Sequence, residues 1–297
     1  MQSNDHFSLR NIILRRLCRM YPFQKGRFRI MMFLEKMLER KEQLIFDLFG
    51  KYKFSLNLNH HDLESSFYYF IPERYEHETQ RYIKEAVHEN MLAIDIGAHL
   101  GLFTILLADR VGPNGKVYSF EPGSNNYERL KLNLELNQLF QALPIHMALS
   151  RVTAQTHLIL NERSNAGHFL EEINTRHKAF QNQLAEEIQT ITLDEFVEEQ
   201  RIKKIDLIKI DAERSEDLIL EGAKKTLSSG VANRIVCEIP SSAKVIMGQD
   251  QDRVRKIFYS YGYQSYILNT RLSRKKYLSE LTPDEPVVGL QNLLFKK

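Results

Sequence analysis

One stretch of this chain decides its fold: Leu92-Ala93-Ile94-Asp95-Ile96-Gly97-Ala98-His99-Leu100-Gly101-Leu102-Phe103. Its first five residues are mostly apolar and predict a buried strand, and the apolar residues after Gly101 predict a helix. A second apolar run, Val117–Phe120, predicts another strand and is followed by Glu121. Strand, glycine turn, helix, strand and acid in this order are typical of a Rossmann-type sheet that holds an adenosine-containing cofactor.

The residues of the turn distinguish between cofactors. A dinucleotide site requires G-x-G-x-x-G, because its glycines let the backbone approach a pyrophosphate and let the helix pack on the strand. This chain instead has Asp95-x-Gly97-x-x-x-Gly101. A carboxylate in the loop repels a pyrophosphate but suits an ammonium group, directly or through water. The loop therefore favours S-adenosylmethionine, which carries an amino-acid tail and a sulfonium.

Two further residues agree with this interpretation. His99 occupies the middle of the loop, and His is among the residues enriched at positive φ, so the turn remains feasible. Glu121 is placed where an acid accepts hydrogen bonds from both ribose hydroxyls, although it lies further along than the dinucleotide rule of roughly 20 residues. The alternative is a turn without any nucleotide, followed by an unrelated acid.

The whole composition is that of an ordinary soluble protein, with 43% hydrophobic and 27% charged residues among 297. Cys18 and Cys237 are the two cysteines and form neither a disulfide framework nor a zinc site, which fits a reducing compartment. No apolar run reaches the roughly 18 residues that a membrane span needs. We expect a cytoplasmic protein.

The N-terminus is strongly basic. Seven cations are opposed by Asp5 alone and interleave with apolar residues; they are Arg10, Arg15, Arg16, Arg19, Lys25, Arg27 and Arg29. One interpretation is a basic amphipathic helix that contacts an anionic membrane peripherally or a polyanionic partner. The other, which we favour, is a terminal helix whose apolar stripe packs on the domain.

The chain divides near residue 74. Residues 1–74 predict a helical extension, with a helix over Phe28–Leu48 and a small β element at Tyr52–Leu58, and residues 75–297 predict the main domain. A helix over Glu76–Val87 leads into the first core strand.

Regular βα alternation follows and predicts an α/β, doubly wound, mostly parallel sheet. The expected strands are Leu92–Ile96, Lys116–Glu121, Ala142–Leu149, Ile205–Ile210 and Arg234–Ile239, and the expected helices are residues 101–110, 124–139, 215–227 and 250–259. Two late segments, Tyr263–Leu268 and Val287–Phe295, predict an antiparallel edge. Between Thr153 and Ile191 the pattern weakens to extended segments at 156–160 and 187–191 around a polar, helical 169–184. Loops of this kind carry substrate specificity.

Three segments together resemble the FkbM family of S-adenosylmethionine-dependent methyltransferases. They are Ile94-Asp95-Ile96-Gly97-Ala98-His99-Leu100-Gly101, Gly112-Pro113-Asn114-Gly115-Lys116-Val117-Tyr118-Ser119-Phe120-Glu121-Pro122 and Asp206-Leu207-Ile208-Lys209-Ile210-Asp211-Ala212-Glu213. Weaker matches are Asn133, Asn137, Ala148-Leu149-Ser150, Leu193-Asp194 and Glu238. The resemblance implies a Rossmann-like class I methyltransferase fold and methylation of hydroxyl oxygens of sugars, polyketides and similar metabolites.

The matched positions imply a cofactor site. We expect S-adenosylmethionine to be bound by residues of the first loop, the second strand end, the third strand and the fourth strand end, namely Asp95, Gly97, Ala98, His99, Gly101, Glu121, Pro122, Ala148 and Asp211.

The chain departs from the family at two positions. His99 replaces an asparagine, and Arg214 replaces the glycine of Asp-Val-Glu-Gly-Ala-Glu. If that glycine serves the backbone conformation, the arginine must bend the loop differently or reach into the substrate pocket.

Three residues are candidate catalytic groups. Asp211 ends the fourth strand and Glu213 follows it, so one carboxylate can hold the cofactor and the other can take the proton of an acceptor hydroxyl. For Glu213 the alternative is capping of the next helix, a role that we favour for Glu216. His168 is a second candidate base, since its ordinary pKa is near neutral. His60, His61 and Asp62 are adjacent and lack further ligands, so we predict no metal site.

The predicted function is O-methylation of a hydroxyl on a sugar, glycolipid or other metabolite. The alternatives are methylation of RNA or protein, and an inactive cofactor-binding partner protein that lost catalysis through Arg214. We see no aromatic stacking motif or strongly basic core of the kind that binds nucleic acid. The acceptor and the oligomeric state stay open.

Overall fold

The computed structural model describes residues 8–21, 24–58, 63–161, 168–171, 184–239, 251–269, 277–287 and 291–297. The helices are α1 (Leu9–Met20), α2 (Gln24–Glu35), α3 (Leu63–Phe70), the 3-10 turn η1 (Pro72–Arg74), α4 (His77–Ala86), α5 (Leu102–Val111), α6 (Ser124–Glu135), α8 (Leu193–Glu199), α9 (Glu216–Glu221), α10 (Lys224–Ser228) and α11 (Gln251–Ser260). The strands are β1 (Leu44–Leu48), β2 (Tyr52–Leu56), β3 (Leu92–Ile96), β4 (Lys116–Phe120), β5 (Ala142–Ile145), β6 (Ala148–Leu149), β7 (Ala154–Ile159), β8 (Phe169–Leu170), β9 (Ala185–Ile191), β10 (Leu207–Ile210), β11 (Arg234–Ile239), β12 (Gln264–Leu268), β13 (Leu278–Leu281) and β14 (Gln291–Lys296).

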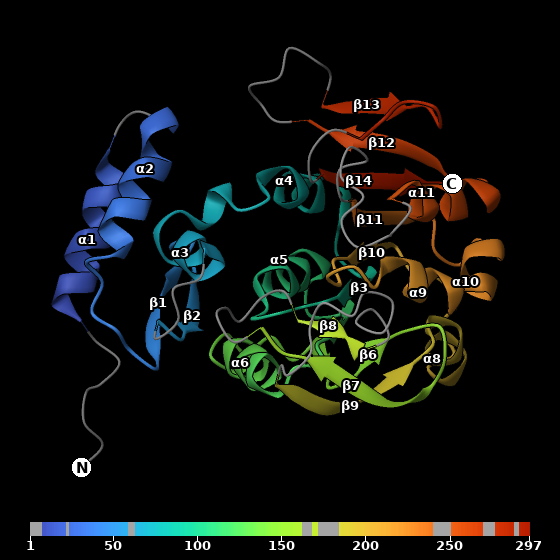
Figure 1. Ribbon diagram of the computed structural model, residues 1–297, viewed down its shortest axis with the longest axis horizontal. Coiled ribbons are helices and arrows are strands. Elements are labelled where there is room, and N and C mark those ends of the chain that lie inside the picture. The colour runs from blue at the N-terminus through green and yellow to red at the C-terminus, as the bar shows by residue number, and fades with distance from the viewer. Residues whose placement is uncertain are drawn as a thin grey trace.

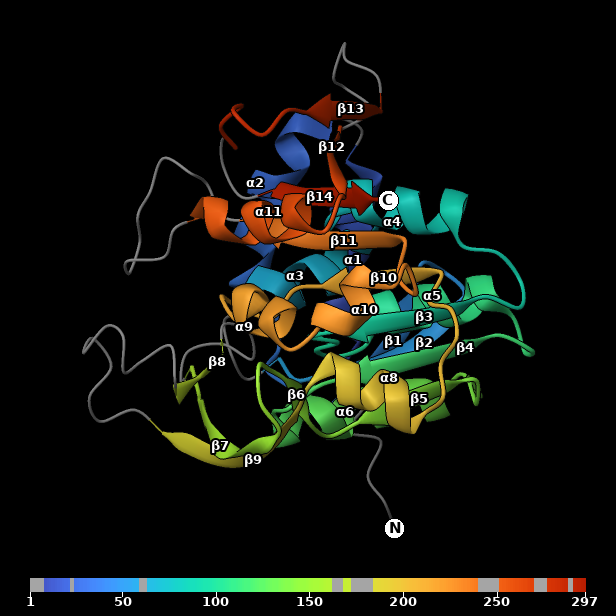
Figure 2. The ribbon, with the colours of Figure 1, turned by 90° about the vertical axis from the view of Figure 1, so that its right-hand side faces the viewer.

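Within those ranges, eight strands form the main sheet in the order β13-β12-β14-β11-β10-β3-β4-β5, stacked from top to bottom in Figure 2. Strands β11, β10, β3, β4 and β5 are parallel. Strand β14 runs against both β11 and β12, so β12 keeps the direction of the parallel strands. The predicted doubly wound sheet with an antiparallel strand is confirmed, and β13, which the sequence pattern did not indicate, extends its edge.

Helices cover both faces of this sheet because its strands are apolar on both sides (Figures 1 and 2). In a strand, neighbouring side chains point to opposite faces. Leu207 of β10 and Val236 of β11 pack with residues of α4, α5 and α6. Their neighbours Ile208 and Ile235 pack instead with residues of α8 to α11.

A second sheet, in the order β6-β9-β7-β8, belongs to the region of weak sequence pattern. The predicted strand over Ala142–Leu149 is therefore wrong as one element: its first half pairs with β4, and Ala148–Leu149 pairs with β9. The extended segments near 156–160 and 187–191 are confirmed as β7 and β9. The helix predicted over 169–184 is wrong at its start, where Phe169–Leu170 pair with β7; residues 172–183 lie outside the described ranges.

The N-terminal region differs most from its prediction. The helix expected over Phe28–Leu48 ends at Glu35, and Leu44–Leu48 pairs with Tyr52–Leu56 as a hairpin. Alternate residues of this segment are buried, which is the two-residue period of a strand. Phe49 and Gly50 both have positive φ and close the hairpin. Helix α3 had no predicted counterpart.

Between residues 215 and 227 the single predicted helix is two, α9 and α10. The break falls at Gly222, where a Cβ atom would lie 2.1 Å from the carbonyl oxygen of Ser150. The backbones approach too closely there for a side chain, so a shape requirement of the tertiary structure interrupts the helix.

The N-terminal hairpin is joined to the sheet domain through asparagines of the α6 region. The buried Asn133 accepts a hydrogen bond from Ser55 N (2.6 Å) and donates to Ser55 O (3.3 Å) and Leu100 O (2.8 Å). The half-buried Asn137 makes the same pair of bonds with Lys53 (2.8 and 2.7 Å), and these two bonds are exposed to solvent. One core cluster also runs from Leu14 to Leu294 across the expected boundary at residue 74.

Replacing Asn133 by alanine should therefore cost about 2–3 kcal/mol of unfolding free energy, because the change leaves buried backbone groups of Ser55 without partners. Asn137→Ala is the matched control, since water can replace its exposed bonds, and should cost less than about 1 kcal/mol. Denaturant unfolding of both variants measures the difference. Equal losses of unfolding free energy in the two variants would show that the burial of the Asn133 hydrogen bonds does not add to their contribution to stability.

Across the described residues no helix is both long and apolar enough to cross a membrane. Cys18 and Cys237 are buried free thiols.

Candidate active site

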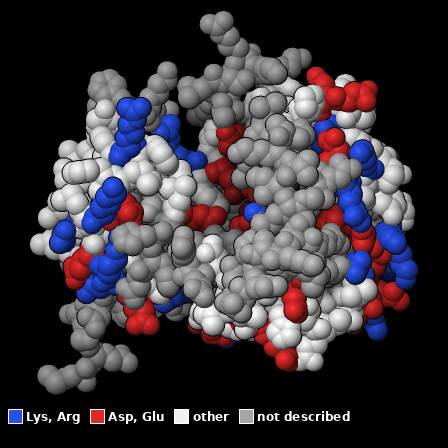
Figure 3. All heavy atoms as spheres, in the orientation of Figure 1, with Lys and Arg blue, Asp and Glu red and all other residues white. Residues whose placement is uncertain are grey.

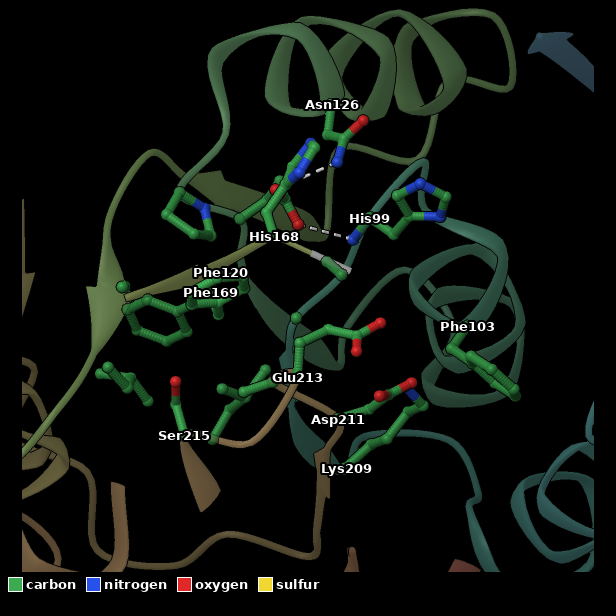
Figure 4. A pocket seen from close by; sticks show the side chains of 18 of the residues that line it. His99, Phe103, Phe120, Asn126, His168, Phe169, Lys209, Asp211, Glu213 and Ser215 are labelled. Atoms are coloured by element: carbon green, nitrogen blue, oxygen red, sulfur yellow. Dashed lines mark hydrogen bonds and ion pairs between the residues drawn. The ribbon is translucent and has the colours of Figure 1, made fainter. Parts of the chain in front are cut away.

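A cavity lies at the carboxyl ends of β3, β4 and β10 (Figure 4). Its volume is about 830 Å³ when the solvent-filled mouth is included. Strand β3 is the point at which the chain reverses its direction of travel across the sheet, and ligands of open α/β sheets bind at such a point. The small second sheet contributes Leu158, His168 and Phe169 to one wall of the cavity.

The loop after β3 has the conformation that its residues predicted. Gly97, His99 and Gly101 have φ angles of +75°, +51° and +92°. The prediction that His99 tolerates positive φ is thus confirmed. Gly97 N and Ala98 N both donate to Phe120 O, at 3.0 and 2.9 Å, which fastens the loop to β4. A Cβ atom on Gly97 would lie 1.8 Å from Asp211 O, so the loop touches the end of β10 and only glycine fits.

Glu121 lies at the end of β4 with its carboxylate held from two sides. Its Oε2 accepts from His99 N (2.9 Å), and its Oε1 accepts from Gly123 N (3.0 Å) and from Asn126 Nδ2 (3.4 Å). Burial raises the pKa of Glu121 to about 7, against the opposing effect of these hydrogen bonds. A carboxylate has about four lone-pair positions, so these three bonds leave capacity for a ligand hydroxyl on Oε2.

Two of the predicted cofactor residues do not line the cavity. Asp95 is fully buried and accepts a hydrogen bond from Thr104 Oγ1 (2.6 Å), and its Oδ1 has no partner among the described residues. Burial raises the pKa of Asp95. Gly101 is the N-cap residue before α5, and a Cβ atom there would lie 2.7 Å from a methyl group of Leu130. The others, Gly97, Ala98, His99, Glu121, Pro122, Ala148 and Asp211, all line the cavity.

Lys209 is a site residue that the sequence analysis missed. It is buried, its Nζ lies 3.0 Å from Asp211 Oδ2, and the same nitrogen lies 4.5 Å from the ring centre of Phe103. Burial alone lowers the pKa of Lys209, but neighbouring Asp211, Glu76 and Asp95 raise it above its ordinary value, so the ammonium stays protonated. A lysine within the apolar run 205–210 was the available signal, because such residues are rarely buried without a partner.

Carboxylates outnumber this cation around the cavity. Burial raises the pKa of both Glu76 and Glu238, which interact with Asp211. In Figure 3 acidic side chains gather deep in the hollow at the middle of the molecule, with a blue patch among them. The raised pKa values keep Glu76 and Glu238 protonated near neutral pH, so the negative charge at the cavity comes from its lining acids, which include Glu64, Asp211 and Glu213. This acidic lining disfavours anionic ligands.

The loop after β10 is strained at two successive residues. Glu213 and Arg214 have φ angles of +47° and +77°. Glu216 holds the loop, since its Oε1 accepts from Ala212 N (3.1 Å) and Arg214 N (3.3 Å). Arg214 thus adopts a left-handed conformation that a glycine at this position would adopt without strain.

Glu213 and His168 occupy different parts of the cavity. The Glu213 carboxylate points into the cavity between His99 and the Asp211–Lys209 pair, whereas His168 lies on the side of Asn126 (Figure 4). His168 Nδ1 accepts from Asn161 N (2.9 Å), which places the ring proton of the neutral imidazole on Nε2. Burial lowers the pKa of His168 to about 4.

The N-terminal extension supplies a wall that sequence reasoning also missed. Glu64 and Tyr68 of α3, with Tyr75, line the cavity. Tyr75 donates to Glu64 Oε1 (3.0 Å), and the Tyr68 hydroxyl lies 3.3 Å from His99 Nδ1. The aromatic run Phe67-Tyr68-Tyr69-Phe70 was the available signal, but no local pattern places it against a loop 30 residues away.

Among the described residues, no group of three or more His, Cys, Asp or Glu side chains is arranged so that it could bind a metal ion. His60, His61 and Asp62 lie outside those ranges.

Several solved structures are similar to this chain at low identity. A putative rRNA methylase from Clostridium thermocellum has 12% identity and a TM-score of 0.43, over 74% of this chain and 93% of that chain. An S-adenosylmethionine-dependent O-methyltransferase from Thermotoga maritima has 14% identity and a TM-score of 0.43, over 75% and 65%. M. jannaschii TYW2 in complex with AdoMet has 14% identity and a TM-score of 0.44, over 88% and 89%.

No curated protein matches the chain significantly. The family model described as the methyltransferase FkbM domain matches residues 95–265, which is more than half of the 297 residues. This range contains the glycine loop, Glu121 and the strained loop after β10. The chain belongs to the FkbM family and is an S-adenosylmethionine-dependent methyltransferase.

Proposed function

We propose that this protein transfers a methyl group to a hydroxyl oxygen of a sugar, glycolipid or other small metabolite. The observation that carries the proposal is the Glu213 carboxylate, which points into the cavity from a strained loop directly beside the cofactor turn (Figure 4). Strained residues of this kind cluster at functional sites, where the surrounding structure holds them in place.

The cavity fits S-adenosylmethionine. Glu121 retains acceptor capacity on Oε2 for a ribose hydroxyl, and the apolar side chains of Met147, Leu149 and Phe169 suit the adenine. Gly97, Ala98 and His99 border the methionine portion, and Asp211 suits its ammonium group. Pro122 and Ala148 also line the cavity. Asp95 and Gly101 do not contact it; Asp95 accepts a hydrogen bond from Thr104, and Gly101 connects the loop to α5. When bound, the cofactor supplies an electrophilic methyl group on a sulfonium.

Glu213 is the proposed general base, and Asp211 a binding residue. Asp211 already accepts a charge-assisted hydrogen bond from the Lys209 ammonium on its Oδ2, so this oxygen is engaged by a protein donor. Glu213 lies two residues after Asp211 and also lines the cavity. Its carboxylate can take the proton of the substrate hydroxyl as the new C–O bond forms. The protein's remaining task is to hold acceptor oxygen and methyl group in line. His168 contributes packing beside Glu121, since its Nδ1 is engaged.

The wall of Tyr68 and Tyr75 suits a neutral ring as acceptor, because sugar rings offer apolar C–H faces to aromatic side chains. The acids Glu64, Asp211 and Glu213 line the cavity and outnumber Lys209, which argues against a polyanion such as RNA.

Cofactor affinity should depend on pH through Glu121, whose pKa burial raises to about 7. Ribose hydroxyls donate to the ionised carboxylate, so binding releases the proton and the affinity falls as the pH drops below 7, approaching tenfold per pH unit. Calorimetry across this range measures the slope. Glu121→Gln should bind weakly with the slope removed; a slope that persists in this variant would assign it to another group.

A labelled-methyl assay tests the proposed function. The protein is incubated with S-adenosylmethionine labelled at the methyl carbon and with separated glycan, lipid, small-metabolite, protein and RNA fractions of a cell extract. We expect label as a methyl ether in the glycan, lipid or metabolite fraction. Label confined to RNA or protein would overturn the proposal, and so would cofactor binding without any labelled fraction.

A further inference from the structure

Helix α1 has a second apolar stripe that the fold does not cover. Leu14 and Cys18 face the core and are buried. On the other side of the helix, Leu9, Ile13, Leu17 and Met20 are exposed by 65%, 49%, 53% and 77%. These four side chains are spaced by four, four and three residues, which aligns them along one helix face. The core packing that we favoured from sequence thus accounts for only one of the two apolar stripes.

Polar contacts fix the rotation of α1, so the exposed stripe is not an alternative core face. The buried Asn11 donates to Glu39 O (2.9 Å) and accepts from Glu39 N (2.8 Å). Arg15 donates to Asp47 O of the hairpin (2.6 Å) and its guanidinium lies 4.6 Å from the ring centre of Phe46. Turning the stripe inward would break all of these contacts.

Helix α2 adds further exposed apolar side chains at the same end of the molecule (Figure 1). Phe28, Met32, Phe33 and Met37, on α2 and just after it, are exposed. Eight of the fourteen exposed large hydrophobic side chains in the described ranges therefore belong to residues 9–37. The two helices lie together at one end of the molecule (Figure 1). We call this set of eight side chains the apolar face; it is Leu9, Ile13, Leu17, Met20, Phe28, Met32, Phe33 and Met37.

Cations border the apolar face. Arg10, Arg16, Arg29 and Lys36 are exposed, and Figure 3 shows blue side chains between white ones over these helices. The sequences of α1 and α2 contain a single acid, Glu35, and this residue pairs with Arg40 (3.1 Å). The surface is therefore cationic as well as apolar.

This combination selects among the possible occupants. In a two-fold interface the same cationic surface of two copies would meet itself, so positive charges would face positive charges. RNA would satisfy the arginines but leave the apolar side chains in water. An anionic bilayer satisfies both, because its headgroups pair with the cations and its acyl chains bury the apolar side chains.

We propose that the α1–α2 lobe docks the protein peripherally on an anionic lipid bilayer through the apolar face and its bordering arginines. Among the described residues, none of α1 or α2 lines the cavity. Docking can therefore fail while methyl transfer remains, and methyl transfer can fail while docking remains.

Sedimentation of the full chain with vesicles tests this docking. The protein should bind vesicles of phosphatidylcholine mixed with phosphatidylserine, bind phosphatidylcholine alone weakly, and lose binding as salt is raised. Replacing Ile13 and Leu17 together by serine should weaken binding roughly tenfold. Replacing Arg10 and Arg16 by glutamine should weaken it by a similar factor and reduce the preference for the anionic lipid.

The matched control is Phe140→Ser, which removes a side chain that is 79% exposed outside the lobe and should leave vesicle binding unchanged. Circular dichroism and cofactor binding should stay at wild-type values in all variants, because none of these residues is in the core or the cavity. Absence of wild-type binding to anionic vesicles would overturn the proposal. So would a wild-type dimer that the serine variant dissociates, or binding of an RNA oligonucleotide that only the glutamine variant loses.

Discussion

Replacing Gly97 by alanine should abolish measurable S-adenosylmethionine binding. The new Cβ atom would lie 1.8 Å from Asp211 O, which is a backbone atom and cannot swing away as a side chain can. The residue also has a φ of +75°, which costs an L-residue roughly 1–2 kcal/mol. The loop can relieve the collision only by moving away from β10, and that movement changes the cavity that the loop borders.

A second glycine separates these two effects. Gly230 has the same φ of +75°, but a Cβ atom there would meet nothing closer than Asn233 Oδ1 at 3.7 Å. Gly230→Ala should lose roughly 1–2 kcal/mol of stability and keep wild-type cofactor affinity. Calorimetry with the cofactor and thermal unfolding of both variants provide the comparison. Near-normal affinity in Gly97→Ala would mean that the contact with Asp211 is not part of the cofactor site.

Replacing Glu213 by glutamine should lower kcat by roughly 10²–10³-fold while leaving the Kd for S-adenosylmethionine nearly unchanged. The amide keeps the size and the hydrogen-bonding capacity of the side chain but cannot accept the hydroxyl proton. The measurement is steady-state kinetics with the acceptor that the labelled-methyl assay identifies.

Asp211→Asn is the informative companion because it lies on the same loop with a different proposed role. It should weaken cofactor binding and lower stability, since the buried Lys209 ammonium loses its closest counter-charge. A variant pair in which Glu213→Gln impairs binding and Asp211→Asn impairs only kcat would reverse the two roles. Full activity of Glu213→Gln would remove Glu213 as the base.

Strands of the sheet were predictable where the local pattern had one solution. Leu92–Ile96 and Arg234–Ile239 are short apolar runs between turn residues, and both were predicted with the bounds that the structure has. Leu44–Leu48 was not, because its apolar residues also fit the helical spacing of the segment before it. Its pairing with Tyr52–Leu56 decided the outcome. Ala148–Leu149 likewise left the predicted strand because β9 offers it a partner in another sheet.

In the candidate site, the sequence alone indicated the residues whose chemistry is local. Gly97, His99 and Glu121 form a turn and a strand end, and both features are encoded within a few residues of the chain. Lys209 and Tyr68 were missed because their importance depends on neighbours far away in the sequence. Lys209 matters through the carboxylates that surround it, and Tyr68 through its place beside His99.

The sequence by itself determined the cofactor turn, the order of the βα units and the family, since these follow from local conformation and from motifs in fixed order. The tertiary structure decided which distant segments contact one another and which side chains stay exposed. It placed the Gly97 loop against the end of β10, inserted α3 into the cavity wall, and locked α1 with its second apolar stripe outward. These are contacts between distant segments, and their energies depend on packing and burial that no local pattern contains.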